Sequence, residues 1–146
     1  MLTYLRATGK DVTLLAQMNK QLIEDEGHSN PMTEDQLTER MRVWLLGHYE
    51  AILFYRQDLL VAYALIRFDP TRIYLRQFFV GRAHRRQGIG REAISLLLDE
   101  ILPQDQRIVV EALAANRPAV EFWQATGFER YSIAFERLPM EPMDTT

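Results

Sequence analysis

The sequence contains no cysteine, and this absence excludes several kinds of chemistry at once. Without a thiol the chain has no disulfide, no cysteine nucleophile and no thiolate metal site. The histidines, His28, His48 and His84, are not accompanied by a cluster of other ligands, so we expect no metal. A chain without cysteine fits a reducing compartment, and we expect a cytoplasmic protein.

Long apolar runs and a strong net charge are also missing. No run is long enough to span a bilayer, and the N-terminus lacks the basic start and long apolar stretch of a signal peptide. The formal net charge is −3, which gives the chain no general attraction for nucleic acid. We therefore expect a partner that is neither a membrane nor a nucleic acid.

What the chain does contain is an ordinary globular composition: 146 residues, of which 47% are hydrophobic and 25% charged. This length suits one domain, so we expect residues 1–146 to form a single domain with residues 139–146 as a frayed tail.

Hydrophobic periodicity and turn residues predict alternating strands and helices. The predicted strands span 2–6, 49–56, 59–68, 73–80, 107–113 and 128–138, and the predicted helices span 11–25, 33–47, 88–101 and 118–126. The three consecutive strands from 49 to 80 form an antiparallel meander, whereas 107–113 follows a crossover helix and is expected to be parallel to 73–80. The pattern predicts an α+β fold with a mixed, mostly antiparallel sheet.

A basic loop lies between the strand at 73–80 and the helix that follows it. Its basic or potentially basic side chains are Arg82, His84, Arg85 and Arg86. Gly88 and Gly90 then stand where the helix begins, and glycine lets another group approach the backbone closely. The first N–H groups of a helix have no internal partner and carry the positive end of its dipole. Together with the arginines, this predicts a polyphosphate ligand.

Two glycine motifs compete for this stretch. Gly88 to Ala93 fits the dinucleotide fingerprint G-x-G-x-x-A, and Glu111 lies near the expected distance for a ribose-binding acid. In that fingerprint the first glycine follows the strand almost directly, whereas here the basic loop separates Val80 from Gly88. The chain also lacks room for a full dinucleotide domain with a substrate domain. The phosphate-loop motif is excluded because no G-K-[ST] is present.

The other motif includes the arginine. Arg85-Arg86-Gln87-Gly88-Ile89-Gly90 fits R/Q-x-x-G-x-G/A and resembles the acetyl-CoA signature of the GNAT N-acetyltransferase superfamily. A downstream segment, Asn116 to Trp123 followed by Gly127-Phe128, is similar to that superfamily's N-x-x-A-x-x-F-Y followed by G-F. Both motifs occur in order with a predicted strand between them. The resemblance covers about the last two thirds of the chain, and the first third fits loosely.

This resemblance implies a GNAT-like α+β fold: a mixed, mostly antiparallel sheet of six to seven strands flanked by about four helices. It also implies that the central strands at 73–80 and 107–113 splay apart, with the pantetheine arm of acetyl-CoA in the cleft. The residues expected to bind acetyl-CoA are Phe78, Phe79, Val80, Arg85, Arg86, Gln87, Gly88, Ile89, Gly90, Arg91, Asn116, Ala119, Phe122 and Trp123.

Acetyl transfer from a thioester requires that the amine lose a proton, that the oxyanion be held and that the thiolate leave. A free amine with a pKa of about 10.4 is mostly protonated at neutral pH, so a carboxylate or histidine helps. The candidates for this base are Glu24, Glu26, His28 and Glu111. For the first three the alternative is a solvated acidic helix end, and for Glu111 an exposed sheet face. By resemblance, a backbone N–H near Phe79 and Val80 holds the oxyanion.

The chain departs from the family at Trp123, where the family has a tyrosine credited with protonating the thiolate. An indole N–H donates a hydrogen bond but no usable proton. Either another tyrosine such as Tyr131 serves as the acid, or no dedicated acid exists. The alternative role for Trp123 itself is plain packing in the core. By resemblance Asn116 bonds the pantetheine arm, and its alternative role is a helix cap.

We therefore predict an N-acetyltransferase that uses acetyl-CoA as co-substrate, needs no metal and acetylates a primary amine of a small molecule or peptide. The acidic segment from Glu24 to Glu26 favours a cationic acceptor. The alternative is a non-catalytic acyl-CoA-binding or regulatory domain, which Trp123 at the acid position allows. A homodimer is a further expectation.

Overall fold

The computed structural model describes residues 1–27 and 30–142, and its elements follow the predicted order as far as the last helix. The strands are β1 (Leu2–Arg6), β2 (Tyr49–Arg56), β3 (Leu59–Phe68), β4 (Arg72–Val80) and β5 (Arg107–Val110). The helices are α1 (Val12–Asp25), α2 (Glu34–Leu46), α3 (Ile89–Leu96) and α4 (Arg117–Ala125), and a π-helical turn (Leu97–Ile101) prolongs α3. Among the described residues, no helix has the length and apolar character needed to cross a membrane.

Two helix starts show how the local sequence sets these boundaries. Thr33 caps α2, because its hydroxyl accepts from the Gln36 N–H at 3.2 Å while the Gln36 side chain accepts from the Thr33 N–H at 2.9 Å. This pair of hydrogen bonds is a capping box, and it starts α2 where the helix predicted at 33–47 begins. The helix predicted from Asp11 begins as expected, with Asp11 at the cap position of α1. The Asp11 side chain does not cap it, however, because its carboxylate accepts from the Thr8 N–H at 2.8 Å and closes a 3-10 turn that precedes the helix.

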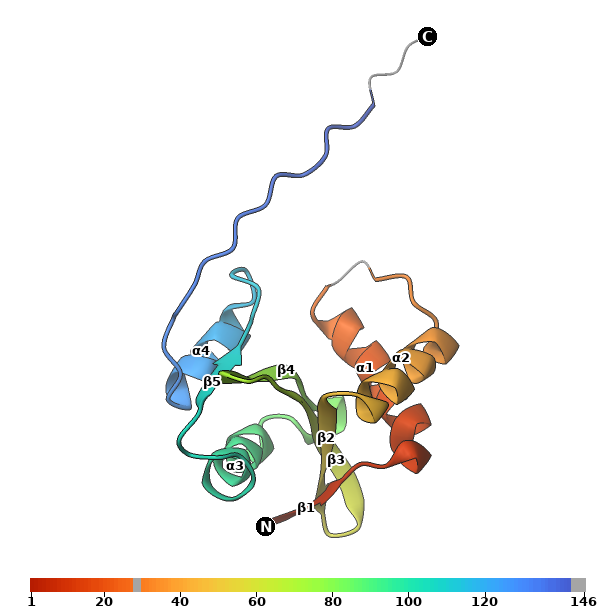
Figure 1. The fold of residues 1–146 in the computed structure, drawn as a ribbon, viewed down its shortest axis with the longest axis vertical. Coiled ribbons are helices and arrows are strands. Elements are labelled where there is room, and N and C mark those ends of the chain that lie inside the picture. The colour runs from red at the N-terminus through yellow and green to blue at the C-terminus, as the bar shows by residue number, and fades with distance from the viewer. Residues whose placement is uncertain (28–29, 143–146) are drawn as a thin grey trace.

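The strands form one sheet in the order β1-β2-β3-β4-β5, in which every neighbouring pair is antiparallel except β4 and β5. Helices α1 and α2 cover one face of the sheet, and α3 and α4 cover the other (Figure 1). Alternate residues of β2 serve the two layers: Ala51 and Leu53 pack with residues of α1 and α2, and Ile52 and Phe54 pack with residues of α3. The predicted α+β fold with a mixed, mostly antiparallel sheet is confirmed.

The parallel pairing of β4 with β5 is short. It runs from Arg72 opposite Arg107 to Leu75 opposite Val110, and the rest of β4 has no partner on that side among the described residues. The strand predicted at 107–113 therefore ends earlier, at Val110. The two central strands are splayed, and the open half of β4 extends from Arg76 to its end.

Strand β4 also changes the direction in which its side chains point where β5 leaves it. Its register with β3 shifts at Arg76, which is an extra residue and forms a β-bulge. Before the bulge, Ile73 and Leu75 pack in the core beneath α3; after it, Phe78 and Val80 do so. The odd-numbered residues of β4 thus face α3 before the bulge, and the even-numbered residues face α3 after it.

The prediction of a last strand at 128–138 is wrong. The segment after α4 is extended, but no strand of the described chain pairs with it, and it runs away from the body (Figure 1). The sheet therefore has five strands rather than six to seven. The physical reason is that a strand exists only where a neighbour accepts and donates its backbone hydrogen bonds.

Candidate functional site

The start of α3 is built without a side-chain cap. Gly88, the residue before the helix, has a φ of 77°, a left-handed conformation that strains any residue with a side chain. Its carbonyl accepts the Glu92 N–H at 3.0 Å, so intrahelical bonding begins there. Since no side chain of the described residues caps the helix, the first N–H groups of α3 are a favourable place for an anion.

Gly90 allows α3 to lie close to its neighbours. A Cβ atom at this position would lie 3.3 Å from the Phe122 ring in α4 and 3.5 Å from the Val80 side chain. The group that lies close to the Gly90 backbone is therefore the Phe122 ring of the same chain. Ile89, between the two glycines, is buried in the core and anchors the first turn of α3.

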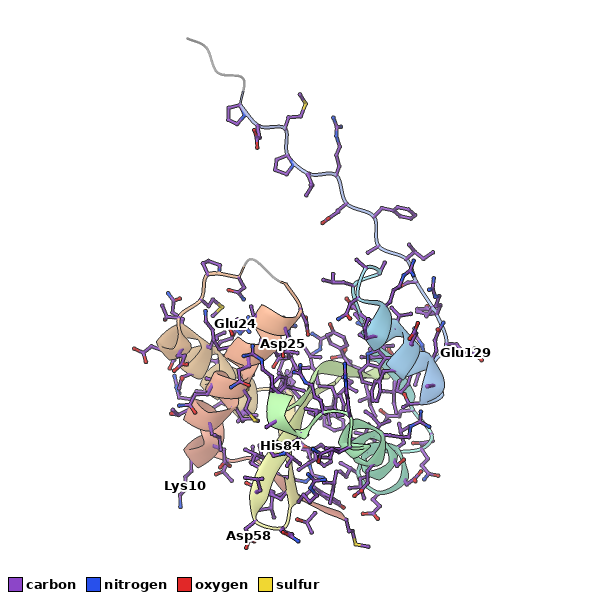
Figure 2. The ribbon with its side chains drawn as sticks, turned by 180° about the vertical axis from the view of Figure 1, so that it is seen from behind. Lys10, Glu24, Asp25, Asp58, His84 and Glu129 are labelled. Atoms are coloured by element: carbon purple, nitrogen blue, oxygen red, sulfur yellow. The ribbon has the colours of Figure 1, made fainter. Side chains whose placement is uncertain are left out.

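Two of the loop arginines are bound by the end of α1. Arg82 donates from Nε to Asp25 at 2.9 Å and from its terminal nitrogen to Glu24 at 3.1 Å. Arg85 also donates to Asp25, and its Nε donates to the Val80 carbonyl at 3.0 Å. Figure 2 places Glu24 and Asp25 at the end of α1 on the side of the loop that contains His84. We call these contacts the loop clamp.

The loop clamp shifts the ionisation of its central carboxylate. Partial burial tends to raise the pKa of Asp25, but hydrogen bonds from Arg85 and Arg82 outweigh it and hold that pKa below its ordinary value. The clamp therefore keeps Asp25 ionised to lower pH than an ordinary aspartate and fixes the loop against α1.

The remaining polar side chains of the loop and the helix start are differently placed. Arg86, with a φ of 62°, and Arg91 are exposed, and neither forms an ion pair within the described part of the chain. Gln87 accepts a hydrogen bond from Arg56 at the end of β2. Arg86 and Arg91 are thus the side chains that remain for a phosphate beside the α3 start.

Aromatic side chains gather beside the open half of β4. Phe78 stacks on Phe122 with ring centroids 5.9 Å apart, and Trp123 meets Phe78 edge-on at 5.6 Å. Phe128 packs against Trp123 at 5.3 Å. Trp123 is therefore part of a packed aromatic cluster. Phe79 points to the opposite face of the sheet, where it is buried near Tyr63.

Asn116 occupies the cap position of α4. Its Oδ1 accepts the Ala119 N–H at 3.3 Å, so the predicted alternative role as a helix cap is present. Its side-chain NH2 has no hydrogen-bond partner among the described residues and remains available to a ligand.

On the sheet face covered by α1 and α2, Tyr74 and Glu111 lie together near the end of the β4–β5 pairing. Burial raises the pKa of Tyr74, and the neighbouring Glu111 carboxylate raises it further. Glu111 itself is exposed and follows β5 directly. A carboxylate next to the point where the strands separate is well placed to take a proton from a molecule approaching this face.

Two arginine guanidinium groups lie over one aromatic ring on the same face of the sheet. The guanidinium of Arg76 lies 4.7 Å from the ring centroid of Trp44 in α2, and that of Arg40 lies 4.4 Å from it. Arg76 also donates to the Tyr49 hydroxyl at 3.2 Å, and Arg40 donates to buried Asn19 at 3.0 Å. Burial and the nearby charge of Arg76 lower the pKa of Arg40. The pair places two positive charges on this face, which also carries the carboxylate of Glu111.

The other catalytic candidates are scattered. Glu24 belongs to the loop clamp, and Glu26 lies near Tyr63, whose pKa is raised by burial and by the charge of Glu26. His28 lies outside the described residues. Tyr131 is 76% exposed in the extended tail, with the Arg107 guanidinium 4.2 Å from its ring centroid. Within the described ranges, no three His, Cys, Asp or Glu side chains form a group that could hold a metal.

Sequence reasoning missed the aromatic and basic residues of the α1–α2 face, namely Tyr74, Arg76, Arg40, Trp44 and Tyr49. A signal for two of them was present, because the polar residues at 72, 74 and 76 alternate with the apolar residues at 73 and 75 and so predict a polar face.

We expect Asp25→Asn to destabilise the protein in a pH-dependent way. Because the folded-state pKa of Asp25 is lowered, its contribution is fully present above the unfolded-state pKa of about 3.9 and is lost as pH falls through the folded-state value. The arginines are roughly half exposed, so the expected loss at neutral pH is about 1 kcal/mol. Urea unfolding at neutral and strongly acidic pH measures it, with exposed Glu121→Gln as control. Equal losses at both pH values would contradict the charge argument.

Comparisons with known proteins agree with this geometry. A model of the acetyltransferase (GNAT) family matches residues 16–128. A comparison with curated protein sequences found no match. A predicted acetyltransferase from Clostridium acetobutylicum, solved with acetyl-CoA, is 22% identical with a TM-score of 0.72, covering 94% of this chain and 96% of that one.

Two aminoglycoside acetyltransferases also have similar structures. The protein meta-AAC0020 from an uncultured soil metagenomic sample, solved with sisomicin, is 16% identical with a TM-score of 0.74, covering 95% of this chain and 97% of that one. AAC(6')-Iy, solved with CoA, is 14% identical with a TM-score of 0.73, covering 96% of each chain. At these identities the likeness shows a shared fold. The family model, however, spans well over half of the sequence, from within α1 to Phe128, and this protein therefore belongs to the GNAT acetyltransferase family.

Proposed function

We propose that this protein is an acetyl-CoA-dependent N-acetyltransferase that acetylates a primary amine of a small molecule or peptide. The observation that carries the proposal is that the uncapped start of α3 comes shortly after the half of β4 that β5 has left. One ligand can therefore place a phosphate at the start of α3 and an acyl arm along the open half of β4. Family membership supports this proposal, as does the acetyl-CoA bound by the similarly folded protein from Clostridium acetobutylicum.

In this proposal the phosphates of acetyl-CoA meet the N–H groups at the start of α3 and the exposed side chains of Arg86 and Arg91. Arg85 contributes indirectly, because it holds the loop through Asp25 and the carbonyl of Val80. The pantetheine arm follows the open half of β4, whose backbone groups lack a β5 partner. The free NH2 group of Asn116 supplies one further donor to the arm.

Bound acetyl-CoA supplies a thioester whose acetyl group passes to the amine. The chain contributes a backbone N–H near Phe79 and Val80 to hold the developing oxyanion, and Glu111 to accept the proton of the amine. A thiol with a pKa of about 8.5 leaves as a thiolate with little help. Trp123 therefore needs no acid role, which agrees with its packing in the aromatic cluster.

The charged side chains near the proposed acceptor site indicate which kind of amine it favours. The acidic end of α1, which led us to expect a cationic acceptor, is largely neutralised because Glu24 and Asp25 are bound by loop arginines. Arg40 and Arg76 place two positive charges on the face of the sheet that also carries Glu111. A face with both arginines and a carboxylate favours an amine that also carries a carboxylate, because the arginines bind the ligand's carboxylate while Glu111 takes the proton of its amine.

The function is tested by following thiol release from acetyl-CoA with a panel of amines of different charge. We expect turnover, with kcat/KM about tenfold higher for amines that carry a carboxylate than for polycationic amines, and a smaller difference in Arg76→Gln. Arg72→Gln is the control, because Arg72 pairs with Asp69. Acetyl-CoA binding without turnover of any amine would favour the alternative, a non-catalytic acyl-CoA-binding or regulatory domain.

Gly88→Val should weaken acetyl-CoA binding by at least about tenfold, because a β-branched residue at a φ of 77° is strained and moves the N–H groups at the start of α3. Titration calorimetry with acetyl-CoA measures the effect. Gly9→Val is the matched control, since Gly9 has no neighbouring heavy atom within 4 Å of an added Cβ and lies far from α3 in sequence. Unchanged affinity in the Gly88 variant would exclude this helix start as the phosphate site.

Glu111→Gln should lower kcat by about 10²–10⁴ if Glu111 is the general base, and should abolish the fall of the rate toward acid pH. The physical reason is that the amide cannot take the proton of the attacking amine. The pH dependence of the rate at saturating acetyl-CoA measures this fall toward acid pH. Glu50→Gln is the control, because the Glu50 carboxylate is bound by Arg6 at the far edge of the sheet. A rate profile unaltered by the Glu111 change means that proton transfer occurs elsewhere.

A further inference from the structure

Among the described residues, Asn19 is the one fully buried polar side chain other than tyrosine. It lies on the inner face of α1, in line with Leu15, Ala16 and Ile23, which pack in the core. An apolar residue at this position would continue the hydrophobic face of the helix, and the amide interrupts it. Packing of α1 therefore does not account for Asn19.

The hydrogen-bond partner of Asn19 is Arg40 in α2. A terminal nitrogen of Arg40 donates to Asn19 Oδ1 at 3.0 Å and so joins the two helices. Two further donors of this pair, Asn19 Nδ2 and Arg40 Nε, are buried and have no hydrogen-bond partner in the described part of the chain. A buried donor without a partner lowers the stability of the fold, so stability alone does not account for the pair either.

The amide of Asn19 is neutral, and this determines its effect on Arg40. A carboxylate would also hold the guanidinium, but it would cancel the positive charge, as Asp69 does for Arg67. Burial and the neighbouring charge of Arg76 lower the pKa of Arg40, but a guanidinium keeps its proton in a protein. Asn19 thus fixes the half-buried side chain of Arg40 and leaves its charge in place.

Arg40 is held where a second guanidinium lies close. Its guanidinium carbon is 4.4 Å from the ring centroid of Trp44, and that of Arg76 in β4 is 4.7 Å from the same centroid. Like charges beside each other repel, and a carboxylate relieves this repulsion because its two oxygens accept charge-assisted hydrogen bonds, one from each guanidinium. Arg76 follows Leu75, where the pairing with β5 stops, so a carboxylate bound here lies beside the open half of β4.

We propose that Asn19 is a positioning residue for acceptor recognition: it holds Arg40 beside Arg76, and the two guanidinium groups bind the carboxylate of the acceptor amine. Asn19 does not touch the acceptor and acts through Arg40. The proposal rests on the proposed function, because it concerns which amine is acetylated, and it identifies the side chain that sets the preference for a carboxylate.

Steady-state kinetics with a carboxylate-bearing amine and its carboxamide counterpart test this role. Asn19→Asp keeps the shape of the side chain and the accepting oxygen, but its charge cancels that of Arg40. We expect KM for the carboxylate-bearing amine to rise about tenfold, with kcat nearly unchanged and no rise in KM for the carboxamide. Gln17→Glu is the matched control, because it makes the same amide-to-acid change on the exposed side of α1. A KM that rises equally for both amines, or for neither, overturns the proposal.

A second variant removes the hydrogen bond instead of the charge. Asn19→Leu supplies an apolar side chain of similar size but no acceptor for Arg40, and we expect the same selective rise in KM of about tenfold. If Asn19 served only the packing of α1 on α2, this variant would keep the preference for the carboxylate, and that result overturns the proposal. Circular dichroism checks that each variant keeps its fold.

Binding of a carboxylate that cannot be acetylated gives a readout without turnover. N-acetylglycine has a carboxylate but no primary amine, and its binding beside Trp44 should change the fluorescence of that ring, a response that Trp44→Phe should abolish. We expect Asn19→Asp to weaken this binding about tenfold and Gln17→Glu to leave it unchanged. No response in the wild-type chain, or equal affinity in the two variants, overturns the proposal whether or not any amine is acetylated.

The two kinds of failure are distinguishable. If N-acetylglycine binds as expected but no amine is acetylated, the proposed function is wrong and the carboxylate site stands. If amines are acetylated but the changes at Asn19 leave the preference for a carboxylate intact, the proposed function stands and the role of Asn19 is wrong.

Discussion

The parallel pairing of β4 with β5 stops after Leu75 and Val110, and the candidate site depends on this stop. On the N-terminal side of this stop, the ladder holds β5 to the sheet. On its C-terminal side, the backbone groups of β4 have no β5 partner, and Phe78 packs against the rings of α4. A buried polar group without a partner costs about 1–3 kcal/mol, so an open strand in a partly covered space is favourable for a ligand that brings its own amide groups. The pantetheine arm of acetyl-CoA is such a ligand.

The loop that follows the open strand is held from two directions. Asp25 at the end of α1 binds Arg82 and Arg85, which draws the loop toward one layer of the structure. Gly90 lets the start of α3 lie against Phe122, which fixes the helix to the other layer. The N–H groups between these two attachments are therefore positioned before any ligand arrives, which reduces the entropy that binding has to overcome.

Much of this could be predicted from the sequence, because the features that succeeded are local. The capping box at Thr33, the glycine at 88 and the order of elements as far as α4 depend on residues close together in the chain. The features that failed depend on distant partners. Nothing near Arg82 in sequence indicates that α1 binds it, and nothing within the tail shows that no strand of its own chain pairs with it. The alternation of side chains was recognised correctly in the tail, but its pairing was not.

The bulge at Arg76 has a consequence for how this sheet tolerates change. By adding one residue, it lets β4 present Arg76 and Gln77 in succession to the α1–α2 face while returning Phe78 to the face of α3. Without the bulge, the same residues would follow an unbroken two-residue repeat, and the strand after Arg76 would be rotated by half a turn. The rings that border the open strand would then project toward α1, and Phe79 would take their place. Deleting Arg76 together with the bulge keeps Phe78 and Val80 on the face of α3, so the harmful change is loss of the bulge while its extra residue is retained.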